Sequence, residues 1–536
     1  MIRINQLKLP IRHTKKDLEE KIGKTLHIPV SSIQSYKIIK QSIDARKKDD
    51  ILYIYSIDVH TDKEDRLVRQ AKNRNVVKAE RASYTFPEHG EEKLSNPPVI
   101  IGEGPAGLFC GLMLARAGYM PVILERGEDV SSRQKKVESF WKGDGLDIRS
   151  NVQFGEGGAG TFSDGKLNTL VKDAGARNKK VLELFVEFGA DERILYQNKP
   201  HIGTDVLSGI VKAMREEIIR LGGTVRFLSQ VTDISIENGR IMGLTVNGTE
   251  HIETEAAVLA VGHSARDTFE MLNMRKVPMR QKPFAVGLRI QHPQRMINLS
   301  QYGEGNDDIL GAASYKLTHQ ASGGRGVYSF CMCPGGYVVN ASSEAGRLAV
   351  NGMSNHARDG LNANSALIVT VTPEDFPGDS PLSGVAYQRA LEEAAYSFGN
   401  GKIPVQLYGD FKSGKESSGF GGVEPQMKGS YTFANLKEML PSYLSQALIE
   451  GVDAFGKIIH GFDRPDAIFA GIESRTSSPI RVDRDSHFES EIKGLFPCGE
   501  GAGYAGGITS AAMDGIRVAE EICRRYQTLT GRLRKG

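Results

Sequence analysis

Cysteine is scarce in this chain, with five residues among 536 and none in a CxxC pair. This scarcity argues against a disulfide-stapled scaffold and against a structural zinc site. It fits a reducing compartment, so we expect a cytoplasmic protein with no metal centre. The closest cysteine pair, Cys331 and Cys333, is assigned to packing rather than to redox or metal chemistry.

Long uninterrupted hydrophobic runs are also missing. The most apolar stretch, residues 98–124, contains Glu103, Pro105 and several glycines, so it suits a buried strand, loop and helix better than a membrane span. The first residues, Met1 to Asn5, lack the charged and then apolar pattern of a signal peptide. We therefore expect no membrane partner.

A strong excess of one charge is absent as well. The net formal charge of +3 is too small for strong nonspecific binding of nucleic acid by the whole chain. The charge is uneven, because residues 1–96 hold 20 Lys and Arg against 14 Asp and Glu, a net +6. A solvated charged surface is the simpler interpretation, and an acidic partner such as RNA is the alternative.

Glycine, in contrast, is abundant at 60 residues, and one cluster has the spacing of a dinucleotide-binding loop. Residues 102–107 read Gly-Glu-Gly-Pro-Ala-Gly between an apolar strand and a helical stretch. In such a loop Gly102 allows a tight turn, Gly104 lets a pyrophosphate approach the backbone, and Gly107 packs helix on strand. Glu125 ends the next strand and is placed to accept hydrogen bonds from ribose hydroxyls. The loop alone fits NAD or FAD.

Two distant segments favour FAD. Residues 256–262 form an apolar strand ending in small residues, as needed where the chain returns close to a dinucleotide. Residues 494–500 read GLFPCGE and end another strand with a carboxylate that can accept a hydrogen bond from a ribityl hydroxyl. A helix then begins at Ile508, and its positive end can stabilise a reduced, anionic flavin ring.

The order GxGPAG, ERG, a mid-chain AxG strand and GLFPCGEG resembles the two-dinucleotide-binding-domain flavoproteins. More narrowly, residues 153–167, 262–267 and 473–479 resemble the bacterial family of uncharacterised FAD-dependent dehydrogenases, and the resemblance spans essentially the whole chain. It implies that residues 157–161 form a second glycine loop beside the pyrophosphate and flavin. The expected cofactor-binding residues are Gly102, Gly104, Pro105, Ala106, Gly107, Glu125, Arg126, Gly157, Gly158, Ala159, Gly160, Thr161, Val231, Ala260, Gly262, Gly499, Glu500, Gly506, Gly507 and Ile508.

These patterns predict an α/β protein with an FAD/NAD(P)-binding Rossmann-like domain, an inserted mixed α+β domain and a small N-terminal α+β domain. The N-terminal module is expected at 1–95, and the discontinuous FAD-binding domain at 96–280 and 466–536. The inserted substrate or cap domain is expected at 281–465, because the βαβ rhythm stops there and returns near the C-terminus.

Five polar residues are candidates for catalysis, each with a competing structural role as a cap, an ion-pair partner or a surface charge. They are His263, Arg266, Asp164, Lys166 and Arg475. Related disulfide reductases carry a redox cysteine pair in the loop corresponding to 157–161. This chain has none between Cys110 and Cys331, so we expect no disulfide reductase chemistry.

The expected function is that of an FAD-dependent oxidoreductase that transfers hydride through flavin N5 to or from an unknown small molecule. A single complete fingerprint argues against a dedicated NAD(P)H domain, although NAD(P)H can serve as a transient reductant. Two alternatives stay open: a flavin-dependent RNA-modifying enzyme, suggested by the basic N-terminal segment, and a flavin-bearing binding or electron-transfer protein.

Overall fold

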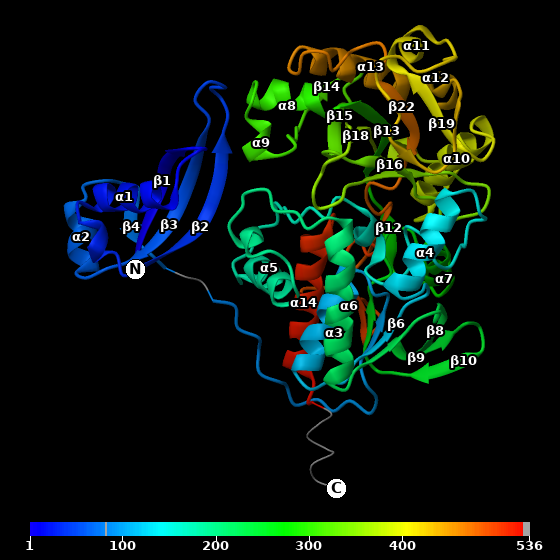
Figure 1. Ribbon diagram of the computed structural model, residues 1–536. Helices are drawn as coiled ribbons and strands as arrows, with labels where there is room; N and C mark the ends of the chain where they lie inside the picture. Colours follow the sequence, from blue (N-terminus) through cyan, green and yellow to red (C-terminus); the bar gives the residue numbers. More distant parts are fainter. Residues whose placement is uncertain (81–82, 529–536) are drawn as a thin grey trace.

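The computed structural model describes residues 1–80 and 83–528. Figure 1 shows three parts: a small N-terminal module at the left, a central α/β domain below and a second domain above it. From the N-terminal module the chain runs beneath the central domain before it enters that domain's first strand.

The N-terminal module is a four-stranded sheet in the order β2-β3-β1-β4 with two helices. Helix α1 begins after Thr14, whose side chain and that of Asp17 each accept a hydrogen bond from the other's backbone N–H. The elements are β1 (Ile2–Pro10), α1 (Lys15–Leu26), β2 (Ser35–Asp44), β3 (Leu52–His60), α2 (Glu64–Gln70) and β4 (Val76–Lys78).

The N-terminal module contacts both other parts. The backbone N–H of Gln41 in β2 donates to the Tyr196 carbonyl at 2.7 Å, and the Asn198 N–H donates to the Gln41 carbonyl at 2.9 Å. Arg12 lies 3.3 Å from Asp308 of the upper domain. The module is therefore docked by a short backbone ladder and an exposed ion pair.

The central domain is built on a parallel five-stranded sheet in the order β24-β11-β5-β6-β7. Strand β5 leads through the glycine loop into α3 and back to β6, which is the βαβ unit expected from the sequence. The sheet therefore confirms the α/β, Rossmann-type fold. Its strands are β5 (Val99–Ile101), β6 (Val122–Leu124), β7 (Thr224–Arg226), β11 (Ala257–Leu259) and β24 (Leu495–Pro497).

Helices α3, α6 and α14 lie side by side and pack on this sheet (Figure 1). Helix α6 buries an apolar stripe that includes Leu207, Ile210 and Met214, and α14 begins at the predicted Ile508. The helices are α3 (Pro105–Arg116), α4 (Val130–Trp141), α5 (Arg177–Glu187), α6 (Thr204–Arg220), α7 (Arg266–Met274) and α14 (Ile508–Arg525). A small antiparallel sheet of β8 (Val231–Glu237), β9 (Arg240–Val246) and β10 (Glu250–Glu253) extends from the side.

The upper domain contains a seven-stranded sheet in the order β14-β15-β18-β13-β22-β19-β21. Its central strands are almost fully buried because helices and a smaller three-stranded sheet cover them. The strands are β13 (Phe284–Pro293), β14 (Thr318–Gln320), β15 (Gly326–Cys333), β16 (Tyr337–Asn340), β17 (Val350–Met353), β18 (Asn362–Val371), β19 (Ile403–Leu407), β20 (Met427–Lys428), β21 (Tyr431–Phe433) and β22 (Ile468–Glu473). The helices are α8 (Gln294–Tyr302), α9 (Asp307–Leu310), α10 (Ser383–Phe398), α11 (Tyr408–Ser413), α12 (Leu436–Met439) and α13 (Ser442–Gly456).

The end of the inserted domain differs from the expected residue 465. Strand β22 pairs with β13 and β19 of the upper sheet, so the insertion continues to at least Glu473. The run Ile-Phe-Ala-Gly-Ile is as apolar as a central strand of the FAD domain, and apolarity alone does not indicate which sheet a strand joins. The two crossings between the domains pair as a ribbon of β12 (Met279–Gln281) and β23 (Ile480–Val482).

Across the described residues, no helix combines the length and the apolar character that crossing a membrane requires.

Candidate functional site

A cavity of about 330 Å³ lies between the central and upper domains. One end is lined by the glycine loop and by residues that follow the central strands. The other end is lined by side chains of the upper domain, including Phe330, Cys331, Asn351 and Glu473. The cavity therefore joins a dinucleotide-binding loop to a second, chemically different wall.

The glycine loop has the conformation that its sequence predicts. Gly102 follows β5 with φ of +99°, a value that favours glycine. A Cβ on Gly107 would lie 1.9 Å from the Gly102 carbonyl oxygen, so the helix packs too closely for any side chain there. Helix α3 begins at Pro105, and its first N–H groups point toward the cavity end where a pyrophosphate is expected.

Glu125 holds three loops together. Its carboxylate accepts hydrogen bonds from the backbone N–H groups of Glu103, Gly127 and Gly155, each at 2.9 Å. One oxygen takes two of these bonds and the other takes one, so a lone pair remains for a ribose hydroxyl. The next residue, Arg126, pairs with Asp267 at 3.0 Å and lines the same cavity end.

The second glycine loop is held in place by Arg133, which is not among the residues predicted from the sequence. Arg133 in α4 is fully buried, and its guanidinium donates only to backbone carbonyls. Burial lowers the pKa of Arg133 to about 10, which still leaves it charged at neutral pH. The accepting carbonyls belong to Asn151, Val152, Gly155, Glu156 and Gly158, at 2.7 to 3.2 Å. Because every residue has a backbone carbonyl, no sequence motif indicates an arginine that binds five of them.

Glu103, the second residue of the glycine loop, is fully buried beneath it. Neither carboxyl oxygen has a hydrogen-bond partner among the described residues. Burial raises the pKa of Glu103 well above its usual range, and the carboxylates of Glu156 and Glu125 raise it further. The raised pKa favours the protonated side chain, which places no negative charge beside the loop.

Most of the expected cofactor-binding residues line this one cavity, and four stand behind it. The four that do not line the cavity are Gly107, Gly157, Thr161 and Gly499. The Gly157 N–H, for example, donates to the Glu103 carbonyl at 3.0 Å and so joins the two glycine loops. The residues that line the cavity are Gly102, Gly104, Pro105, Ala106, Glu125, Arg126, Gly158, Ala159, Gly160, Val231, Ala260, Gly262, Glu500, Gly506, Gly507 and Ile508.

Three catalytic candidates, His263, Asp164 and Lys166, line the cavity. His263 Nδ1 lies 3.3 Å from a Glu500 oxygen, while its Nε2 is buried and has no partner among the described residues. Asp164 lies 3.1 Å from the Lys166 ammonium and also binds Arg358. Burial opposes ionisation of Asp164, but Lys166 and Arg358 outweigh it and lower the pKa of that carboxyl.

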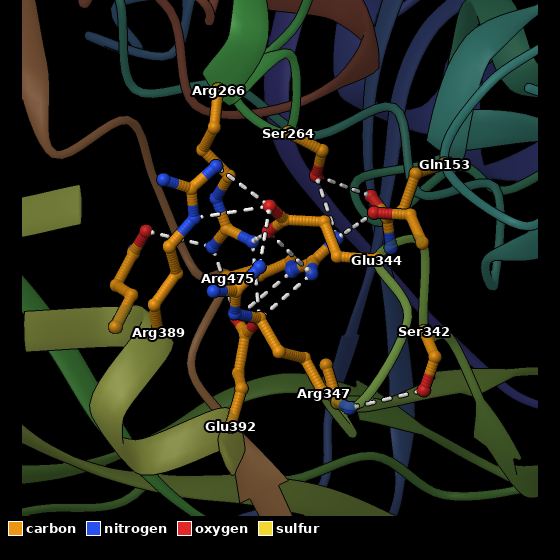
Figure 2. A network of polar contacts seen from close by, with 12 residues as sticks. Gln153, Ser264, Arg266, Ser342, Glu344, Arg347, Arg389, Glu392 and Arg475 are labelled. Carbon is orange, nitrogen blue, oxygen red and sulfur yellow. Dashed lines mark hydrogen bonds and ion pairs between the residues drawn. The ribbon is translucent and has the colours of Figure 1, made fainter. Parts of the chain in front are cut away.

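Arg266 and Arg475 belong to a buried network between the two domains (Figure 2). Both guanidinium groups converge on the carboxylate of Glu392 from α10, at 2.8 to 3.1 Å. Arg266 also pairs with Glu344 at 2.7 Å, and it does not line the cavity. The sequence placed both arginines near flavin or substrate, whereas the structure uses Arg266 to hold the domains together and leaves only Arg475 at the cavity edge.

Side chains of the upper domain complete the cavity and were not among the predicted site residues. Glu473 pairs with the fully buried Arg289 at 2.8 Å, yet burial raises the pKa of the Glu473 carboxyl. Phe330 and Cys331 come from β15, and Asn351 comes from β17. Phe330, Cys331 and Asn351 belong to no recognisable sequence motif, and the fold of the upper domain brings them together.

Comparison with known proteins agrees with this description. Residues 283–476 match the model of a family described as "FAD-dependent protein, C-terminal domain-like", and residues 1–60 match a domain of unknown function. A protein of Clostridium beijerinckii, titled "Uncharacterized protein", is 51% identical over 530 residues, which are 98% of this chain and 99% of the relative. The chain belongs to this family of FAD-dependent proteins.

Solved structures with similar architecture are more distant from this FAD-dependent protein. L-Proline dehydrogenase from P. horikoshii is 12% identical with a TM-score of 0.36, over 81% of this chain and 94% of the other. A geranylgeranyl bacteriochlorophyll reductase-like protein from Thermoplasma acidophilum is 11% identical with a TM-score of 0.36, over 81% and 79%. Similarity at this level does not define a reaction, so the assignment rests on the family match.

The cavity residues of this FAD-dependent protein fit the cofactor. A Cβ on Gly104 would meet only the Gly158 Cα, at 3.9 Å, so the chain leaves open space at the position expected for the pyrophosphate. Glu125 retains a free lone pair, and the buried Nε2 of His263 has no protein partner among the described residues. Within those residues, no group of three His, Cys, Asp or Glu is arranged to hold a metal ion.

Proposed function

We propose that this protein is an FAD-dependent oxidoreductase whose cofactor lies along the cavity and whose inserted domain selects a small-molecule substrate. One observation carries the proposal: a single cavity runs from the glycine loop to a wall of polar side chains from the upper domain. When bound, FAD supplies hydride transfer at flavin N5. The protein must then orient the reactants, handle protons and exclude water.

The central domain supplies the binding functions. Backbone N–H groups at the start of α3 would hold the pyrophosphate, and the free lone pair of Glu125 would accept from the ribose. Gly506 and Gly507 line the cavity and lead into α14, an 18-residue helix whose positive end therefore lies at the cavity. That field favours negative charge on a reduced flavin ring.

His263 is the residue we assign to proton transfer. Its Nδ1 is oriented by Glu500, which leaves Nε2 free to hold a proton inside the cavity. His263→Asn should retain FAD but slow substrate-dependent flavin reduction about 100-fold, the low end of general acid–base effects. The pH dependence of that rate should flatten, and an unchanged pH profile would contradict the assignment.

A matched glycine pair tests the cofactor site itself. Gly104→Val should fold normally because there is open space at its Cβ, but it should weaken FAD binding at least about 10-fold, or about 1.4 kcal/mol. Gly209→Val on the exposed side of α6 also enters open space and should retain FAD fully. FAD content is measured by absorbance after gel filtration. Equal retention in both variants, or a colourless wild type that cannot be reconstituted, would contradict the proposal.

The substrate is to be sought by anaerobic reduction of the holoprotein. NADH, NADPH and a panel of metabolites are tested as donors, with loss of flavin absorbance as the measurement. We propose NAD(P)H as a transient reductant, because the cavity offers one dinucleotide loop rather than two. Reduction by NAD(P)H no faster than that of free FAD would remove it as a partner.

A further inference from the structure

The cavity wall contributed by β15 contains two cysteines that the proposed reaction does not use. Cys331 lines the cavity, and Cys333 lies beneath it, fully buried. The pairing of β15 with β18 is irregular between Phe330 and Cys333, and Cys331 has φ of +41°. This bulge turns the chain at Cys331 and directs the segment toward the cavity.

The two cysteines lie close together. The Cys333 thiol donates to the Cys331 carbonyl at 3.2 Å, so its sulfur lies against the backbone of Cys331. In a regular strand, residues two apart face the same side with Cα atoms ~6.6 Å apart, near the upper limit for a disulfide. The bulge at Cys331 departs from this regular spacing.

Two cations flank the pair, the fully buried Arg289 and the half-buried Lys166. Arg289 donates to the Cys331 carbonyl at 3.1 Å and lies 3.9 Å from the Cys333 sulfur. Lys166 binds the Met332 carbonyl between the two cysteines. The Cys333 side chain lowers the pKa of Cys331 well below its usual range, aided by Lys166 and Arg289, while the Cys331 side chain and burial raise the pKa of Cys333.

This arrangement has the parts of a redox pair. Cys331 lines the cavity, where Cys333 and the flanking cations favour its thiolate, and Cys333 lies beside it as the partner for a disulfide. The three other cysteines, Cys110, Cys498 and Cys523, are buried, and burial raises the pKa of each thiol. Only Cys331 and Cys333 therefore combine cavity access, a neighbouring thiol and flanking cations.

We propose that Cys331 and Cys333 form a dithiol/disulfide pair that exchanges two electrons with the bound flavin and so stores a second pair of electrons in the site. The inference rests on the proposed function, since it requires FAD in the cavity. It differs from the expected packing role, and the pair reaches the cavity from the inserted domain rather than from the glycine loop used by disulfide reductases.

Oxidation of the pair transfers two electrons from the two sulfurs to the flavin. A bond forms between Cys331 Sγ and Cys333 Sγ, and the S–H bond of Cys333 breaks. The two electrons pass to the oxidised isoalloxazine, which also gains the Cys333 proton and one proton from solvent. The reverse reaction cleaves the disulfide and returns both electrons and both protons.

Anaerobic reductive titration of the air-oxidised holoprotein tests the inference. The wild type should take up about four electrons per FAD, two for the flavin and two for the disulfide. Cys331→Ser, Cys333→Ser and the double variant should take up about two. Cys523→Ser is the matched control, because its hydroxyl can keep the bond to the Pro87 carbonyl, and it should still take up about four.

Thiol counting under denaturing conditions gives a readout that does not depend on turnover. Of five cysteines, the oxidised holoprotein should show three free thiols and the reduced protein five. In the Cys333→Ser variant, the remaining Cys331 thiolate should give a long-wavelength charge-transfer band with oxidised FAD, which Cys331→Ser should lack. A yellow wild type with five free thiols and an uptake of about two electrons would overturn this inference alone. A protein that never binds FAD would overturn the proposed function and this inference with it.

Discussion

The two walls of the cavity are built in different ways. The glycine wall of the central domain presents mainly backbone N–H groups and is fixed from behind by the buried side chains of Glu125 and Arg133. The upper wall presents side chains, among them Cys331 and Glu473, from a deeply buried sheet. A backbone wall suits a cofactor shared by many reactions, whereas a side-chain wall sets the reaction. Under the proposed function, this difference assigns FAD binding and substrate choice to separate domains.

The largest expected effect comes from removing the support of the glycine wall. Arg133→Leu removes a donor from five buried carbonyls. Those of Gly155 and Glu156 keep a second donor, the Gly158 N–H and the Thr161 hydroxyl, and each of the others that stays unsatisfied costs about 1–3 kcal/mol. We expect loss of FAD retention and a steep fall in apparent Tm, measured by gel filtration and thermal melting.

The matched control is Arg220→Ala, which removes an exposed arginine paired with Glu217 on α6. It should change stability by no more than about 0.5 kcal/mol. If Arg133→Leu behaves like this control, the glycine wall does not depend on one arginine.

The contact between the walls should be the next most sensitive feature. Glu392→Ala removes the carboxylate shared by Arg266 and Arg475. Glu344 is then the remaining carboxylate for both, 2.7 Å from Arg266 and 3.9 Å from Arg475, and the loss of a buried ion-pair partner should cost about 3–5 kcal/mol. Limited proteolysis should then separate the upper domain from the central one at lower temperature. Glu393→Ala removes the neighbouring exposed carboxylate and should cost about 0–1 kcal/mol. Equal protease resistance of the two variants would contradict the inference that Glu392 holds the two domains together.

Acidification should weaken the upper domain. Burial lowers the pKa of His292 in β13 to about 4 from its ordinary 6.5, so the unfolded state binds the proton first. The resulting stability is complete above pH ~6.5 and is lost as the pH falls toward ~4, by about 3 kcal/mol in total. His292→Gln keeps a donor for the Phe462 carbonyl and should flatten this pH dependence of Tm. If Tm falls with pH as steeply in the variant as in the wild type, a group other than His292 causes the pH dependence.

The glycine wall should respond to pH in the opposite direction. Because the pKa of Glu103 is raised in the folded protein, the folded state holds the proton longer than the unfolded state does, and stability falls as pH rises above ~4.3. Glu103→Gln should therefore raise the apparent Tm at neutral pH and leave it unchanged near pH 4. A destabilised variant at neutral pH would indicate an unseen partner for the carboxylate.

The sequence revealed the glycine wall more fully than the upper wall. Gly102, Gly104 and Glu125 follow from local turn and strand signals, because a dinucleotide loop is contiguous in the chain. Cys331 and Glu473 lie far apart in sequence and meet only through the register of a seven-stranded sheet. Arg266 illustrates the converse error, since its position after an AxG strand suggested the site, while its partner Glu392 lies 126 residues away.

The β12–β23 ribbon makes both junctions of the inserted domain adjacent. Entry and exit at one place allow this domain to be replaced, lengthened or reshaped in evolution without rethreading the parallel sheet that carries the glycine loop. Descendants of such a chain can change their chemistry by altering one domain while inheriting the cofactor site intact.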